Sequence, residues 1–139
     1  MSNKSVLQLV NEAKQRVEHL SVADVVTEVD IGQALLIDIR EAGELLQNGS
    51  IPGAVAAPRG MLEFYADSNS PDYREELQPT RRTILYCANG ERSALAADTL
   101  QQIGYTNVAY LDGGLTAWQE AGQPTVPALS WYKPLTNYP

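Results

Sequence analysis

The stretch Ile84-Leu85-Tyr86-Cys87-Ala88-Asn89-Gly90-Glu91-Arg92 joins an apolar run to the only cysteine of the chain and then to a short polar loop. Residues 92–103, which follow, have the spacing of a helix. A glycine-containing loop that closes onto a helix N-terminus directs several unpaired backbone N–H groups toward one point, where the helix dipole is positive. A thiol at that point ionises more readily than a free cysteine. The pattern therefore indicates that Cys87 is a nucleophile, although a buried cysteine that only ends a strand fits it too.

Arg92 lies in the first turn of the expected helix. Its guanidinium adds a positive charge and a fork of donors that suits an oxyanion. Two interpretations stay open at this point. Arg92 either binds the anionic part of a substrate, or it pairs with Asp38 or Glu91 and shapes the loop.

Three apolar runs lack the alternation of a half-buried strand: Ala34–Ile37, Ile84–Tyr86 and Val108–Leu111. Such runs are typical of strands covered on both faces, so the predicted fold class is α/β, with a mostly parallel sheet flanked by helices. We expect helices over 4–19, 23–29, 41–47, 92–103 and 115–121, the second capped by Ser21. Asp38 and Arg40 follow the first run, and we expect them to brace the loop after Cys87 rather than to perform chemistry.

Composition excludes several classes of protein. The chain has 139 residues, 44% of them hydrophobic, which is enough for one core and too little for two ordinary domains. A net charge of −7 argues against a nucleic-acid partner. One cysteine and one histidine, His19, argue against a disulfide framework, a zinc cluster or another metal site, and we expect no cofactor. Charged residues interrupt the apolar pattern of the first twenty positions, so we expect no membrane span and a cytoplasmic location.

The predicted organisation has three parts: an N-terminal helical extension (1–20, with His19 on its surface), one domain (21–124) and an extended C-terminal tail (125–139) laid over that domain. A less regular segment covers residues 58–81, and segments of that length are usually functional or partly helical. Within it, Arg59 and Met61–Phe64 are candidates for a wall of the site, and core packing explains Met61, Leu62 and Phe64 equally well.

Three segments in order resemble the rhodanese-like sulfurtransferase family. The first is Leu36-Ile37-Asp38-Ile39-Arg40-Glu41 with Gly49-Ser50-Ile51-Pro52-Gly53-Ala54, the second is Tyr86 to Ala94 around the cysteine, and the third is Val108-Ala109-Tyr110-Leu111-Asp112-Gly113-Gly114 with Trp118 and Gly122. Each motif alone is weak, but their order and spacing over residues 20–125 make the set specific.

The resemblance implies a three-layer fold with a five-stranded, mostly parallel sheet, and a Cys87 that carries sulfur as a persulfide. The loop residues Ala88, Asn89, Gly90, Glu91 and Arg92 would hold the persulfide through their amides. The sequence departs from the family pattern at two positions. Ser50 replaces a histidine that many relatives carry, which we interpret as structural. Ala88 replaces an arginine, so the site has one cation fewer.

The expected reaction moves the outer sulfur of a small donor such as thiosulfate to cyanide or a thiol, with a protein thiol as a further candidate acceptor. Two other classes stay open. A cysteine phosphatase or arsenate reductase also uses a cysteine, a backbone cradle and an arginine, but its signature places five residues between the two, whereas four separate Cys87 from Arg92. A non-catalytic regulatory or persulfide-carrying module is the other class.

Overall fold

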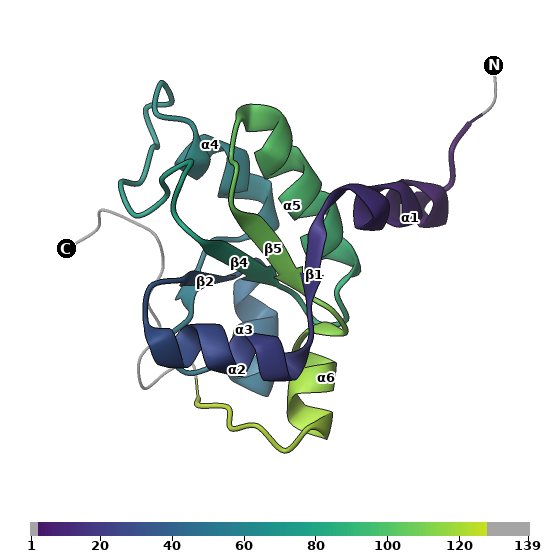
Figure 1. Ribbon diagram of the computed structural model, residues 1–139, viewed down its shortest axis with the longest axis vertical. Helices are drawn as coiled ribbons and strands as arrows, with labels where there is room; N and C mark the ends of the chain where they lie inside the picture. The colour runs from purple at the N-terminus through teal and green to yellow at the C-terminus, as the bar shows by residue number, and fades with distance from the viewer. Residues whose placement is uncertain (1–2, 128–139) are drawn as a thin grey trace.

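A computed structural model describes residues 3–127 of the chain. Within them, five strands form one sheet in the order β1-β5-β4-β2-β3, and every neighbouring pair is parallel. The strands are β1 Glu18–Leu20, β2 Leu35–Asp38, β3 Val55–Ala56, β4 Thr83–Tyr86 and β5 Val108–Leu111. This topology confirms the predicted α/β class and places β4 in the centre, between β5 and β2 (Figure 1).

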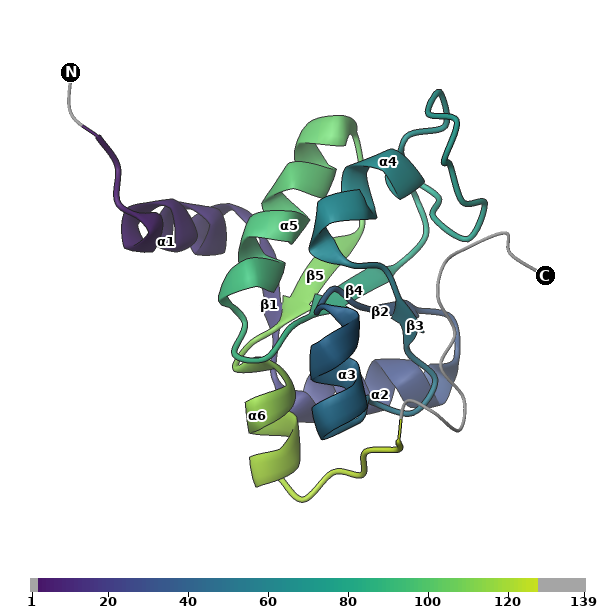
Figure 2. The same ribbon diagram turned by 180° about the vertical axis from the view of Figure 1, so that it is seen from behind.

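Helices cover both faces of the sheet, as expected from the apolar runs (Figures 1 and 2). They are α1 Val6–Arg16, α2 Val22–Ile31, α3 Ala42–Asn48, the 3₁₀ turn η1 Arg59–Met61, α4 Leu62–Ala66, α5 Glu91–Ile103 and α6 Gly114–Glu120. Ser21 caps α2 by accepting from the amide of Asp24 at 3.1 Å, as predicted.

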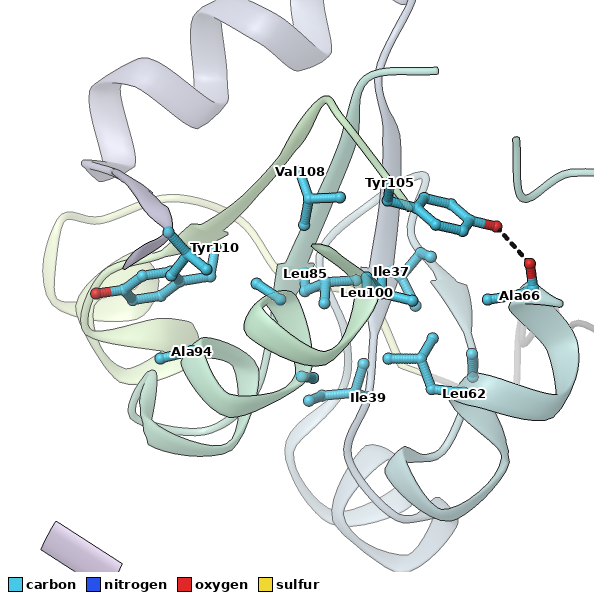
Figure 3. Packing of buried hydrophobic residues seen from close by; sticks show 14 of the residues in the cluster. Ile37, Ile39, Leu62, Ala66, Leu85, Ala94, Leu100, Tyr105, Val108 and Tyr110 are labelled. Atoms are coloured by element: carbon cyan, nitrogen blue, oxygen red, sulfur yellow. Dashed lines mark hydrogen bonds between the residues drawn. The ribbon is translucent and has the colours of Figure 1, made fainter. Parts of the chain in front are cut away.

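The side chains of successive residues along β4 and at its end pack alternately into two separate hydrophobic clusters, one on each face of the sheet. Leu85 and Cys87 point into a cluster with α1, α4 and α5, whereas Ile84 and Tyr86 point into a cluster with α2 and α6. Figure 3 shows the first cluster, in which Leu85, Leu100 and Val108 pack together. Since each face of the sheet is buried, the strands need no polar alternation. Cys87 therefore faces α5, and its neighbour Tyr86 faces the opposite layer.

The first predicted helix was too long. Helix α1 ends at Arg16, Val17 is extended, and residues 18–20 form β1 at the edge of the sheet. There His19 is exposed and pairs in register with Tyr110, so its predicted place on a helix was wrong, although its exposure was right. Helical spacing and a three-residue strand are hard to separate locally, and pairing with β5 decides the outcome.

The irregular segment at 58–81 is partly helical, as expected. Leu62 of α4 is buried in the first cluster. The Tyr105 hydroxyl donates to the carbonyl of Ala66, the last residue of α4, at 2.9 Å, which holds the end of α4 against the rest of the domain (Figure 3). The start of the predicted tail is also fixed: Ser50 and Val126 form an antiparallel bridge. Residues 128–139, the rest of that predicted tail, lie outside the described residues.

Candidate active site

Cys87 directly follows β4 and is fully buried. Its Sγ accepts hydrogen bonds from the backbone amides of Gly90, at 3.2 Å, and Ser93, at 3.4 Å. The Ser93 hydroxyl lies 3.5 Å from the same sulfur and donates to the Gly90 carbonyl at 3.1 Å. The sulfur thus sits against the first turn of α5, where amides that have no helical partner are available to a negative charge.

The loop after Cys87 is held from behind by α6. The amides of Leu115 and Thr116 donate to the carbonyls of Cys87 and Ala88 at 2.9 and 3.0 Å. Gly114, with φ of +60°, permits this approach, because a Cβ there would lie 2.5 Å from the Cys87 carbonyl oxygen and 2.7 Å from that of Ala88. Close backbone packing against α6 therefore sets the conformation of the loop.

Three amides of this loop have no hydrogen-bond partner among residues 3–127: those of Ala88, Asn89 and Arg92. The carbonyls of Cys87 and Ala88 point toward α6, and in a trans peptide the N–H of the next residue points the opposite way. The amides of Ala88 and Asn89 are therefore directed away from α6. Unpaired donors beside a nucleophile are what an anionic ligand or intermediate requires.

Arg92 pairs with neither of the predicted partners. Its two terminal nitrogens donate to both carboxylate oxygens of Glu44 on α3, at 2.9 and 2.8 Å. This ion pair joins α3 to the first turn of α5. The Arg92 guanidinium lowers the pKa of Glu44 to about 2 and has its own pKa raised by the same pair. Glu91 instead accepts from the Asn89 side chain at 3.0 Å.

Asp38 and Arg40 form a buried ion pair at 2.7 Å. Arg40 also donates to the Gly49 carbonyl at 2.7 Å, so the pair fixes the end of α3 and the turn after it. Ser50 lies within 2.8 Å of the Tyr86 hydroxyl and donates to Asp38 at 3.3 Å, which supports the structural interpretation of this position. The contacts of Asp38 and Arg40 reach α3, which holds Glu44, rather than the residues of the loop itself.

The residues of the 58–81 segment that were candidates for a site wall lie in different environments. Leu62 packs in the core, while Phe64 is 53% exposed and Arg59 pairs with Glu63 at 2.6 Å. Sequence reasoning missed the roles of Ser93, Glu44 and Gly114. Only Gly114 left a signal, since a double glycine before a helix indicates an unusual backbone.

No group of three or more potential metal ligands occurs within residues 3–127, and no helix among them is long and apolar enough to cross a membrane.

Residues 21–121 match the rhodanese-like domain family. The chain belongs to this family. It is 32% identical, over 104 residues, to the thiosulfate sulfurtransferase GlpE of Shewanella oneidensis, covering 75% of this chain and 94% of that protein. Other curated relatives are longer, and the chain spans only 40%, 57% and 23% of three of them.

Solved structures of two further proteins resemble this rhodanese-like chain. A Rhodopseudomonas palustris protein of unknown function, described as a possible tyrosine phosphatase, is 36% identical with a TM-score of 0.85, covering 91% of this chain and 97% of that one. The polysulfide-sulfur transferase homodimer of Wolinella succinogenes is 29% identical with a TM-score of 0.68, covering 84% and 83%. The predicted family and fold are confirmed.

Proposed function

We propose that the protein is a sulfurtransferase that carries sulfane sulfur as a persulfide on Cys87. The observation that carries the proposal is the position of the Cys87 sulfur, which accepts from the amides of Gly90 and Ser93 beside three amides without a partner in the described chain. A persulfide extends the side chain by one sulfur. The added anionic atom needs the donors that the amides of Ala88, Asn89 and Arg92 can supply.

The proposed first step is attack of the Cys87 thiolate on the outer sulfur of a donor such as thiosulfate. A bond forms between Sγ and that sulfur, the donor's S–S bond breaks, and sulfite leaves with the bonding electron pair. In the second step a nucleophile such as cyanide or a thiol attacks the outer sulfur of the persulfide and returns the Cys87 thiolate. Neither step needs a cofactor or a general base, which suits a chain whose only histidine, His19, lies in β1 at the edge of the sheet.

Intact-mass measurement tests the proposal directly. Protein reduced and freed of small molecules is incubated with thiosulfate or with 2-hydroxyethyl persulfide, then with cyanide. We expect addition of one sulfur atom by at least one donor and its removal by cyanide. Cys87→Ser should take up none while keeping its fold, because a serine Oγ can accept from the same amides. Failure of both donors to load intact, reduced protein would overturn the proposal.

A cysteine phosphatase is the second candidate, because the similar Rhodopseudomonas palustris protein is described as a possible tyrosine phosphatase. The loop favours sulfur transfer: four residues separate Cys87 from Arg92, and both terminal nitrogens of Arg92 are engaged by Glu44 rather than available to a phosphate. Parallel assays with an aryl phosphate and the sulfur donors separate the two. Phosphate release that depends on Cys87, without sulfur loading, would support the phosphatase.

The proposed chemistry also indicates the kind of partner. We propose a small sulfane donor and a thiol or cyanide acceptor, with a protein thiol as another candidate acceptor, in the cytoplasm. A persulfide-carrying module without efficient turnover would load sulfur at Cys87 in the same experiment but release it slowly to small acceptors, so the rate of the cyanide step distinguishes a carrier from an enzyme.

A further inference from the structure

Three arginines follow the carboxyl ends of strands at the edge of the sheet where Cys87 lies, and each is paired with a carboxylate. Arg40 follows β2 and pairs with Asp38, Arg59 follows β3 and pairs with Glu63, and Arg92 follows β4 and pairs with Glu44. The positive charge of each of these three arginines is therefore matched by a negative one.

The pair that involves the cysteine loop is Glu44 with Arg92. Glu44 engages both terminal nitrogens of Arg92 and also accepts from the Glu41 amide at 2.9 Å, so its carboxylate is fixed at the start of α3. The helix is anchored in turn by Arg40, which donates to the Gly49 carbonyl beyond its end. Because the guanidinium presents its planar fork to Glu44, that fork is not presented to a ligand at Cys87.

Two further carboxylates increase the negative charge near the loop. Glu91 is the first residue of α5 and Asp112 directly follows β5, and both are exposed. Neither forms an ion pair within residues 3–127. A donor that carries two negative charges approaches this edge against like charge, whereas a neutral or singly charged donor meets much less opposition.

We propose that Glu44 is a specificity-determining residue that makes the site select neutral or singly charged persulfides over dianionic thiosulfate. This inference rests on the proposed function, because it concerns the donor that loads Cys87. With an alkyl persulfide, R–S–SH, the thiolate attacks the outer sulfur, a new S–S bond forms at Sγ, and the thiolate RS⁻ leaves with the electron pair. The proton stays on the transferred sulfur. With thiosulfate, the leaving group is the dianion sulfite, which is repelled by the Glu44 carboxylate that holds Arg92.

The experiment compares the rate of sulfur loading from thiosulfate and from 2-hydroxyethyl persulfide in three proteins: the unaltered chain, Glu44→Gln and Glu120→Gln. Glutamine at position 44 can still accept from the Glu41 amide, so α3 keeps its cap. Glu120 is exposed at the other end of α6, and its change alters net charge equally.

We expect the unaltered protein to load faster from the persulfide. Glu44→Gln should raise kcat/KM for thiosulfate about tenfold, the order expected when one charge is removed near a dianion and an arginine is freed. The persulfide rate should change by less than about twofold on the same grounds. Salt should accelerate thiosulfate loading more in the unaltered protein than in Glu44→Gln, and Glu120→Gln should behave like the unaltered protein.

The experiment distinguishes failure of this inference from failure of the proposed function. If neither donor loads the unaltered protein, sulfur transfer itself is wrong. If both donors load it but Glu44→Gln changes their rates by the same factor, Glu44 has only a structural role and this inference is overturned. It is overturned equally if thiosulfate is the better donor of the unaltered protein, or if Glu120→Gln reproduces the effect.

Discussion

Replacement of Gly114 by alanine should impair sulfur loading at Cys87 much more than it impairs folding. Gly114 begins α6, and the two amides that follow it hold the carbonyls of Cys87 and Ala88. A Cβ at position 114 would lie 2.5 Å from the Cys87 carbonyl oxygen and 2.7 Å from the carbonyl carbon and oxygen of Ala88. Backbone atoms cannot rotate away as a flexible side chain can, so the loop or the helix must move.

The size of the effect has two parts. A residue with a side chain costs about 1–2 kcal/mol in the left-handed region that Gly114 occupies. Relief of the overlap costs a further 1–3 kcal/mol or so, by analogy with overpacking. The two costs together reach at most the lower end of the roughly 5–15 kcal/mol by which domains are typically stable, so we expect the variant to fold. A displacement of roughly 1 Å in the loop, however, can reduce the rate by about a hundredfold.

Gly122→Ala is the matched control. Gly122 also has a positive φ, +76°, but a Cβ there meets no atom within 4 Å. Both variants should lose stability in denaturant unfolding, and only Gly114→Ala should load sulfur slowly, as followed by intact mass against time. Loading of folded Gly114→Ala at the unaltered rate would show that the contact with α6 does not position the loop.

Three further predictions concern the persulfide, the Glu44 pair and the layer behind the site. Isolated persulfidated protein should keep its sulfur under anaerobic conditions until a thiol or cyanide is added, because the chain has no second cysteine that could accept the sulfur from Cys87. Rapid loss of the sulfur without an acceptor, followed by timed mass spectra, would refute this prediction. The pKa of Glu44 is lowered from 4.5 to about 2, so its pair with Arg92 should stabilise the fold fully above pH 4.5 and lose that contribution as the pH falls toward 2. Urea unfolding at pH 6 and pH 3 measures the free energy of unfolding that is lost on acidification. This loss should be larger in the unaltered protein than in Glu44→Gln, by up to about 1 kcal/mol. Tyr86→Phe should lower the free energy of unfolding by about 1–3 kcal/mol, because the buried Ile51 amide loses the hydroxyl to which it donates at 3.1 Å. An unchanged free energy in denaturant unfolding would show that this hydrogen bond does not stabilise the fold.

Local sequence patterns predicted most of the elements because each pattern has a local cause. The apolar run Val108–Leu111 is β5 with the predicted bounds, and the helix expected from Arg92 begins one residue earlier, at Glu91. The strand β1 escaped prediction because three residues after a helix contain too few alternations to indicate a strand, and only the neighbouring β5 makes them one.

The sequence by itself determined that a lone cysteine ends a buried strand and precedes a glycine loop and a helix, since those features depend on residues that are neighbours in the chain. Tertiary structure decided what surrounds that cysteine. The pairing of Arg92 with Glu44 and the support of the Cys87 and Ala88 carbonyls by α6 join residues far apart in sequence. They arise because β4 lies between β2 and β5, which brings the segments following all three strands to one edge of the sheet. No local pattern encodes which strands become neighbours, and the charge around the cysteine depends on that order.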